Sequence, residues 1–133
     1  MSYIVKIGKE INISNVNEIL NLVGWGEYTP EQWKIVIDKS TFMVEVLHQN
    51  QTIGFARVVD DTRMCMIYDV CVHPDYQKQG VGTLLMKEVL KYVEANDFAV
   101  VNLFYDRDNK GLDNFYRKFG FESIPNAMRL MKR

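Results

Sequence analysis

The 133-residue chain lacks several features that mark specialised classes of protein. Its formal net charge is only −1, so it has no basic surplus of the kind that binds nucleic acid or an anionic membrane. No apolar stretch reaches the roughly 18 residues that a membrane span requires. The N-terminal residues lack the charged region and long apolar stretch of a signal peptide. We therefore expect a cytoplasmic protein with no nucleic-acid or membrane partner.

Cysteine and histidine are also scarce. Cys65 and Cys71 lie on or beside one predicted strand, where their Cα atoms would be roughly 20 Å apart. A disulfide requires a Cα separation below about 7 Å, so we expect two unpaired cysteines that pack as small apolar side chains. His48 and His73 have no Cys or carboxylate at metal-ligand spacing, so no metal site is expected.

The remaining composition is that of an ordinary globular protein, with 47% apolar and 25% charged residues. We expect residues 1–133 to form a single domain. Ser14 is predicted to cap a first helix, and Thr29 a second one in which Pro30 and Gln32 complete a capping box. Strands alternating with helices predict an α/β fold on a mixed sheet. Two further helices are predicted, from Gly80 and over 109–119, with strands over 3–7, 42–47, 52–59, 64–72, 99–105 and 128–131.

Residues 66–85 are the most informative stretch. Aromatic and β-branched residues from Met66 to Val72 indicate a strand, which Pro74 ends. Apolar residues spaced three and four apart after Gly82 indicate an amphipathic helix. Gly80 and Gly82 would let an anion approach the unpaired N–H groups of the first helical turn. The stretch is neither a Walker loop nor a dinucleotide fingerprint, and a plain strand-to-helix turn is the alternative.

The whole pattern resembles a known motif. Val-Cys-Val-His-Pro-Asp-Tyr-Gln-Lys-Gln-Gly-Val-Gly over 70–82, with Leu84 and Leu85 following, resembles the acetyl-CoA-binding motif of the GCN5-related N-acetyltransferase (GNAT) family. A second block, from Asn109 to Phe121, looks like that family's Asn-x-x-Ala-x-x-x-Tyr and Gly-Phe, with Leu112 where Ala is usual. The resemblance implies a mixed, mostly antiparallel sheet with splayed central strands and helices on both faces.

The resemblance also implies acetyl-CoA as co-substrate and no metal. Helix N–H groups would hold the pyrophosphate, the central strand would pair with the pantetheine arm, and one strand N–H would polarise the thioester carbonyl. Tyr116 would protonate the departing thiolate, since a phenol with a pKa near 10 is a reasonable acid; the alternative is a core aromatic residue. The implied cofactor-binding residues are Val70, Cys71, Val72, Lys78, Gln79, Gly80, Val81, Gly82, Thr83, Asn109 and Tyr116.

Asp69 is the candidate general base, because an unpaired carboxylate is unusual in the middle of a strand. It would accept a proton from the amine, directly or through water, or hold the ammonium of the substrate. The alternative is a structural salt bridge to an arginine such as Arg57 or Arg107. Glu27 is the second candidate base, since the loop between the first two helices borders the acceptor site in the family.

Aromatic residues in that loop suggest the acceptor. Trp25, Glu27 and Tyr28, together with Tyr105 after the splayed strand, would suit an amine cation on an apolar or aromatic body. The alternative is that Trp25 and Tyr28 pin the loop to the core. The segments Trp25–Trp33 and 67–72 also look loosely similar to the serotonin (arylalkylamine)-type acetyltransferases of bacteria and plastids.

The expected function is transfer of an acetyl group from acetyl-CoA to a primary amine by direct attack in a ternary complex. An acyl-enzyme on Cys71 is disfavoured, because no histidine lies beside it to activate the thiol. An acyl-CoA-binding regulatory module without catalysis remains an alternative, as does an acetyltransferase of protein lysines or N-termini. The chain is expected to be a monomer or a homodimer.

Overall fold

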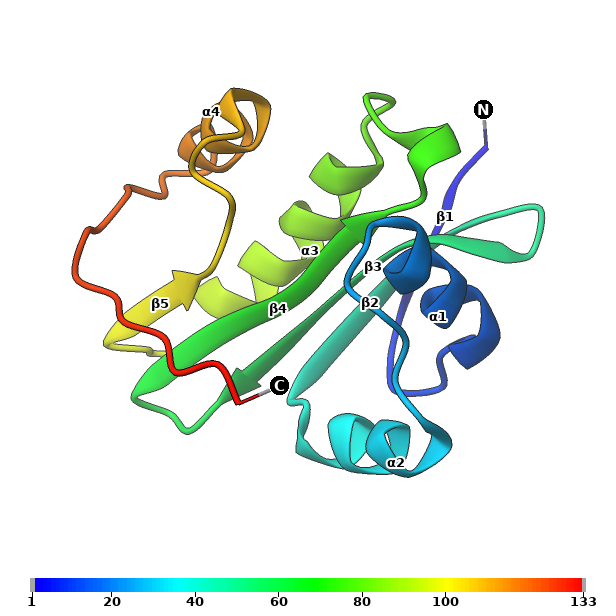
Figure 1. Ribbon diagram of the computed structural model, residues 1–133, viewed down its shortest axis with the longest axis horizontal. Helices are drawn as coiled ribbons and strands as arrows, with labels where there is room; N and C mark the ends of the chain where they lie inside the picture. Colours follow the sequence, from blue (N-terminus) through cyan, green and yellow to red (C-terminus); the bar gives the residue numbers. More distant parts are fainter. Residues whose placement is uncertain (1, 133) are drawn as a thin grey trace. The chain divides into compact units, whose positions relative to one another are not determined.

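A computed structural model describes residues 2–132, which fall into two compact units, one up to Leu103 and one from Phe104 onward. The elements of the first unit and the helix of the second follow one another along the chain (Figure 1). They are β1 (Ile4–Ile7), α1 (Ile13–Leu22), α2 (Pro30–Lys39), β2 (Phe42–His48), β3 (Gln51–Asp60), β4 (Met64–Val72), the 3-10 turn η1 (Pro74–Tyr76), α3 (Val81–Glu94), β5 (Val100–Leu103) and α4 (Lys110–Arg117). No helix within residues 2–132 has the length and apolarity that a membrane span requires.

The first unit is built on one sheet of five strands in the order β1-β2-β3-β4-β5. Strands β1 to β4 pair antiparallel in succession, and β5 joins β4 in parallel. The turn between β2 and β3 has two residues, Gln49 and Asn50, both with positive φ, which matches the twist of a tight hairpin. The predicted α/β class, mixed sheet and antiparallel meander are confirmed.

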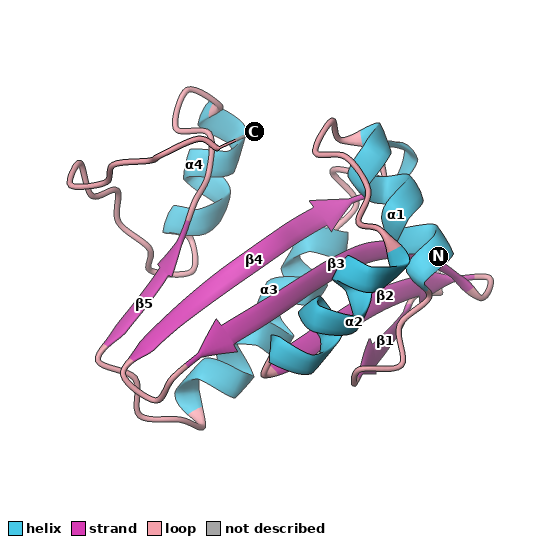
Figure 2. Ribbon diagram, turned by 60° about the horizontal axis from the view of Figure 1, so that its bottom comes forward, coloured by secondary structure: helices cyan, strands magenta, loops and turns pink. Residues whose placement is uncertain are grey.

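Helices cover both faces of this sheet. Figures 1 and 2 show α1 and α2 on one face and α3 on the other. The core between α1, α2 and the sheet contains Val16, Ile19, Leu20, Trp33, Met43, Phe55 and Cys71, each no more than 4% exposed. Cys65 and Cys71 are both buried and unpaired, as expected.

Gly54 on β3 allows α3 to start close to the sheet. A Cβ atom at this position would lie 2.7 Å from Val81 Cγ1, closer than real Cβ contacts come, and 3.2 Å from Leu85 Cδ1, which is tighter than most such contacts. The first turn of α3 therefore packs against the backbone of β3, and the position of that turn depends on the missing methyl group.

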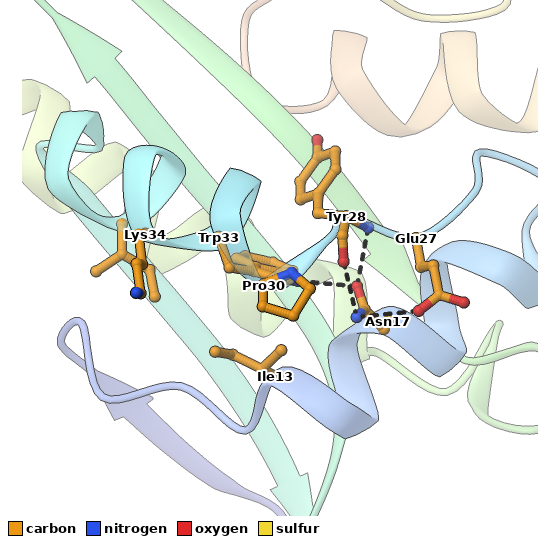
Figure 3. A pocket seen from close by; sticks show the side chains of 8 residues that line it. Ile13, Asn17, Glu27, Tyr28, Pro30, Trp33 and Lys34 are labelled. Carbon is orange, nitrogen blue, oxygen red and sulfur yellow. Dashed lines mark hydrogen bonds between the residues drawn. The ribbon is translucent and has the colours of Figure 1, made fainter.

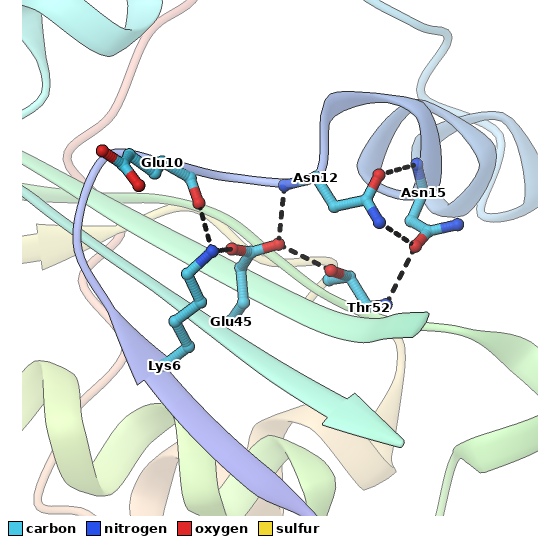
Figure 4. A network of polar contacts seen from close by, with 6 residues as sticks. All are labelled: Lys6, Glu10, Asn12, Asn15, Glu45 and Thr52. Carbon is cyan, nitrogen blue, oxygen red and sulfur yellow. Dashed lines mark hydrogen bonds and ion pairs between the residues drawn. The ribbon is translucent and has the colours of Figure 1, made fainter. Parts of the chain in front are cut away.

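A buried carboxylate attaches α1 to the sheet. Glu45 on β2 is 1% exposed and accepts hydrogen bonds from Thr52 Oγ1 at 2.6 Å and from the backbone N–H of Asn12 at 3.0 Å (Figure 4). The ammonium of Lys6 lies 3.8 Å from its other oxygen and also donates to the carbonyl of Glu10. A buried charge with this set of partners is compensated, and it fixes the chain where α1 begins.

The predicted starts of the first two helices have different outcomes. Thr29 and Gln32 form the predicted reciprocal capping box, and Pro30 is the first residue of α2. The prediction that Ser14 caps α1 is wrong, because Asn12 caps it by accepting a hydrogen bond from the N–H of Asn15. Asparagine and serine are about equally good caps, so the sequence alone does not decide between two candidates that are two residues apart.

The predicted last strand, 128–131, is also wrong, since these residues form no strand and Met128 is fully exposed. The strand predicted over 99–105 is shorter and ends at Leu103. An alternating apolar pattern describes a surface that can pair, but a strand exists only where a neighbour satisfies its backbone groups. No such pairing to 128–131 occurs within the described residues.

Candidate active site

A β-bulge interrupts β4 where the sequence places Asp69. Tyr68 pairs with Arg57 and Cys71 pairs with Phe55, so two residues of β4 stand opposite the single residue of β3 between them. Asp69 is one of these two and has φ of +56°, a left-handed conformation that aspartate tolerates better than most residues. The bulge turns this residue and Val70 out of the regular ladder.

The edge of β4 that faces β5 is open beyond the bulge. β5 pairs with β4 only from Met64 to Ile67 and then ends. Within residues 2–132, no strand pairs with the remainder of β4 on that side. Because the N–H of His73 bonds to the carbonyl of Ile53, alternation directs the N–H and C=O of Val72 toward the open edge.

Three predicted cofactor residues, Val70, Cys71 and Val72, lie on this part of β4. Cys71 pairs with Phe55 on β3, so the backbone groups that alternation leaves at the open edge are those of Val70 and Val72. The Val72 carbonyl accepts a hydrogen bond from Gln77 Nε2 at 3.1 Å. An extended ligand with alternating amide groups fits such an edge as an added strand would.

The loop between β4 and α3 contains a capped 3-10 turn and two residues with left-handed backbone. His73 Nδ1 accepts a hydrogen bond from the N–H of Asp75 and caps η1. Lys78 and Gly80 both have positive φ, and α3 begins directly after Gly80. A Cβ on Gly80 would meet no atom within 4 Å, so the space in front of the helix is open.

The first turn of α3 supplies the donors for that space. The N–H groups of Val81, Gly82 and Thr83 have no carbonyl partner within the helix, and the helix dipole adds positive potential there. The side chain of Gln79 instead holds the loop, since its Oε1 accepts from Tyr3 Oη at 2.7 Å and its Nε2 donates to the carbonyl of Asp75. The loop therefore fits a pyrophosphate through its backbone.

Asp69 forms a partly buried group with two other side chains. Its Oδ2 accepts hydrogen bonds from Arg57 Nε at 2.7 Å and from Tyr28 Oη at 2.8 Å, and the side chains of Asp69 and Arg57 are 15% and 12% exposed. The salt bridge to Arg57 that the sequence left open is thus present. Its Oδ1 accepts no hydrogen bond from the described residues, so one oxygen remains for a substrate, and the role of Asp69 as base stays a prediction.

Protonation of this group is settled by burial and charge. Burial and the neighbouring Asp69 carboxylate raise the pKa of Tyr28 to about 12, so its hydroxyl donates to Asp69 at neutral pH. Burial alone would lower the pKa of Arg57, but the hydrogen bond and charge of Asp69 outweigh it and raise that pKa. At neutral pH the two donors of this group are therefore a phenol and a guanidinium.

The other predicted acceptor residues of the first unit lie on the loop between α1 and α2. Trp25 is 58% exposed. Glu27 and Tyr28 line a groove of about 350 Å³ between α1 and α2, with Asn17, Trp33 and other residues (Figure 3). Of the predicted acceptor residues, Tyr28 is hydrogen bonded to Asp69. Trp25 does not line this groove.

Sequence reasoning missed Asn17, which bonds to this loop. It lies next to the buried residues Val16 and Leu20 on α1, whereas the side chain of Asn21 one turn later bonds only to Glu27 among the described residues. Nothing in the sequence separates these two asparagines, because both stand among the polar residues of an amphipathic helix.

The second unit contains the remaining predicted site residues. Asn109 caps α4 through its Oδ1, which accepts the N–H of Leu112 at 3.1 Å, while its Nδ2 donates to no other described residue. Tyr116 is 6% exposed, with its ring 6.0 Å from those of both Tyr105 and Phe121. The amide of Asn109 is therefore held in place with its donors available.

Tyr105 is engaged within the second unit. Its hydroxyl donates to Asp113 Oδ1 at 2.7 Å and is also hydrogen bonded to Ser123 Oγ. The hydrogen bonds from Arg117 and from Tyr105 lower the pKa of Asp113. This arrangement gives Tyr105 a structural contact in addition to its predicted contact with substrate.

Cys71 is unsuited to nucleophilic chemistry. Burial, with a smaller contribution from the charge of Asp69, raises the pKa of its thiol. A thiolate is the reactive form of cysteine, so this side chain stays protonated and packs in the core.

Comparisons with known proteins agree on one family. The model of the acetyltransferase (GNAT) family matches residues 13–121. The uncharacterised N-acetyltransferase ycf52 of Gracilaria tenuistipitata var. liui is 32% identical over 126 residues, covering 91% of this chain and 68% of the relative. The histone acetyltransferase TAP1 of Glycine max is 27% identical over 137 residues, covering 93% of this chain and 58% of the relative.

A solved structure has the same fold. A probable acetyltransferase of unknown function from methicillin-resistant Staphylococcus aureus superposes with a TM-score of 0.81 and 26% sequence identity. The match covers 98% of this chain and 99% of that one.

Proposed function

Because the chain belongs to the acetyltransferase (GNAT) family, we propose that it uses acetyl-CoA to acetylate a primary amine. One observation carries the proposal: the open, bulged end of β4 is connected by the short loop 73–80 to a helix whose N-cap is Gly80. The first feature suits an amide-containing arm and the second suits a pyrophosphate. Acetyl-CoA combines both groups and supplies an activated acyl thioester.

The residues of this chain would divide the work of binding. Backbone N–H groups at Val81, Gly82 and Thr83 hold the pyrophosphate, and Lys78 adds charge beside it. The backbone of Val70 and Val72 pairs with the pantetheine arm. Asn109, whose Nδ2 has no other described acceptor, is a further proposed ligand of acetyl-CoA by its match to the family's second motif.

The chemistry follows from the position of the thioester. The amine nitrogen attacks the carbonyl carbon, the N–C bond forms, and the C–S bond breaks. The N–H of Val70 stabilises the negative charge on the carbonyl oxygen. Asp69 accepts the proton of the amine, directly or through water, with Glu27 as the second candidate, and Tyr116 donates a proton to the departing sulfur.

We propose a small amine with an aromatic or apolar body as the acceptor. The exposed ring of Trp25, the ring of Tyr28 and the carboxylates of Glu27 and Asp69 support this choice, since they suit an ammonium on an aromatic body. We place the reaction in the cytoplasm and expect neither nucleic acid nor membrane to take part. A protein lysine is the second candidate, favoured by the name of the relative TAP1, a histone acetyltransferase.

Thermal unfolding with and without acetyl-CoA tests the binding step. A ligand present at about 100 times its Kd should stabilise the chain by about 2.7 kcal/mol. Gly80→Glu should abolish this stabilisation, because a carboxylate and a strained φ would both oppose phosphate binding. Gly8→Glu is the matched control, since Gly8 also has positive φ and open surroundings but lies between β1 and α1.

Release of CoA with tryptamine, phenethylamine and a lysine-containing peptide tests the transfer step. Release with either arylalkylamine supports the proposed acceptor, and release with the peptide alone supports the second candidate. Stabilisation by acetyl-CoA without release with any amine would instead indicate a binding module. No stabilisation of the wild-type chain by acetyl-CoA would contradict the proposed function.

A further inference from the structure

The side chain of Asn17 on α1 makes four hydrogen bonds, three to the loop before α2 and one to α2 itself (Figure 3). Its Oδ1 accepts from the N–H of Tyr28 at 3.1 Å and from Trp33 Nε1 at 2.9 Å. Its Nδ2 donates to the carbonyl of Tyr28 at 3.1 Å and to Glu27 Oε2 at 3.4 Å. Because two donors face the same atom, that atom is the amide oxygen. Both N–H groups of the amide and both lone pairs of its oxygen are therefore hydrogen bonded.

These contacts hold Tyr28 at both ends of its backbone. Its N–H and its C=O both bond to Asn17, and its ring packs edge to face on Trp33 with the centroids 4.9 Å apart. Trp33 is 1% exposed and packs in turn against Phe55 of β3. The phenol of Tyr28 therefore has little freedom to move.

The far end of Tyr28 contacts the candidate base. Its hydroxyl donates to the same Asp69 oxygen, Oδ2, that Arg57 occupies. With two donors on Oδ2, the carboxylate is fixed in orientation and its Oδ1 is the oxygen that remains for an amine. A chain of direct contacts thus runs from Asn17 through Tyr28 to Asp69.

We infer that Asn17 is a positioning residue of the acceptor site, which acts through Tyr28 to orient the carboxylate of Asp69 toward the incoming amine. The inference rests on the proposed function for its link to the amine. It extends that function to a residue on α1 whose side chain touches neither Asp69 nor the cofactor-binding backbone.

Asn17→Ala and Asn21→Ala make a matched pair of variants. Both remove an asparagine from α1 that bonds to Glu27, but only Asn17 also bonds to Tyr28 and Trp33. With tryptamine as the varied substrate, kcat/KM for the amine should fall about 10- to 100-fold in Asn17→Ala, because small misplacements of reacting groups cost rate steeply. KM for acetyl-CoA should stay unchanged, and Asn21→Ala should behave as wild type.

A second variant covers the case in which Asn17→Ala does not fold. Asn17→Asp keeps an acceptor for Trp33 Nε1 and for the N–H of Tyr28, but it places a carboxylate against Glu27 and the Tyr28 carbonyl. Its kcat/KM for the amine should fall less than that of Asn17→Ala. Acetyl-CoA should raise its unfolding midpoint as much as that of wild type. Equal amine kcat/KM in wild type and in every folded Asn17 variant would overturn the inference.

A double-mutant cycle with Tyr28→Phe separates positioning from general destabilisation. If Asn17 acts through Tyr28, the double variant Asn17→Ala/Tyr28→Phe should be no slower than the slower single variant. Fully additive losses in kcat/KM would mean that Asn17 acts by another route and would contradict the inference.

Hydrogen exchange of residues 24–30 gives a readout that needs no amine. Exchange should be faster in Asn17→Ala than in Asn21→Ala, because only the first variant frees the backbone of Tyr28. Equal exchange in the two would refute the positioning role. A wild-type chain that binds acetyl-CoA and releases no CoA with any amine would refute the proposed function. The acceptor part of the inference would fail with it. Hydrogen exchange would still test the contact between Asn17 and Tyr28.

Discussion

The two halves of β4 differ in the number of strands that pair with them. The candidate site lies on the half that pairs with one strand only. Met64–Ile67 lies between β3 and β5, whereas the part from Tyr68 to Val72 pairs with β3 alone within the described residues. The paired half contributes buried Cys65 and Ile67 to the core. The other half carries the bulge. Backbone that completes no ladder remains available for a ligand, and this is the property that the proposed reaction needs.

Proline substitution in each half gives the largest expected difference. Ile67→Pro removes a donor from the paired half, where Ile67 has partners on both β3 and β5, and should destabilise the fold by about 1–3 kcal/mol because a buried strand carbonyl loses its partner. Val72→Pro removes an N–H that faces the open edge, so it should leave the unfolding midpoint in urea near that of wild type but abolish stabilisation by acetyl-CoA. Urea titrations with and without acetyl-CoA check both.

The comparison between the halves fails if the two variants behave alike. Retention of full acetyl-CoA stabilisation in Val72→Pro would mean that the open edge is not the cofactor-binding surface. Folding of Ile67→Pro with wild-type stability would mean that the paired half does not need its second neighbour.

Tyr116→Phe separates the acetyl-transfer step from the binding of acetyl-CoA to the open half of β4. Loss of the phenol should lower kcat by about 10- to 1,000-fold, since it removes the proposed acid for the leaving sulfur. Stabilisation by acetyl-CoA should be unchanged, because the open edge of β4 and the helix start remain intact. Steady-state kinetics with thermal unfolding measure the two effects, and an unchanged kcat would remove Tyr116 from the mechanism.

The smallest expected effect is a loss of stability at alkaline pH, which arises from the contact between Tyr28 and Asp69 at the bulge. The pKa of Tyr28 rises from 10.0 to about 12 on folding, so its contribution to stability is complete below pH 10 and is lost as the pH rises through 12. Between these values the free energy of unfolding should fall more steeply in wild type than in Tyr28→Phe. Urea titrations at about pH 9 and about pH 11 compare the two slopes, and equal slopes would show that Tyr28 does not remain on Asp69.

The sequence predicts most of what depends on local chemistry. The strand before Pro74, the helix start at Gly80 and the capping box at Thr29 all follow from residue types at fixed short spacing, and all are present. These features need only their own neighbours in the chain, so the pattern of residues is enough to predict them.

The features that the sequence does not predict depend on distant partners. The group of Tyr28, Arg57 and Asp69 joins a loop to two strands, so the sequence offers Arg57 only as one of two partners for Asp69 and does not predict the Tyr28 contact. Asn17 differs from Asn21 only by what the fold brings near it. The strand predicted over 128–131 is absent for the same reason, because pairing requires a second strand that the pattern does not specify.

The bulge at Asp69 also protects the protein against aggregation through the exposed edge of β4. An exposed strand edge is a template on which a strand of another molecule can pair and begin aggregation. A left-handed residue in the middle of that edge breaks the regular spacing of donors and acceptors, and the side chain of Gln77 covers the Val72 carbonyl beyond it. A strand of ordinary geometry therefore finds no continuous register along this edge.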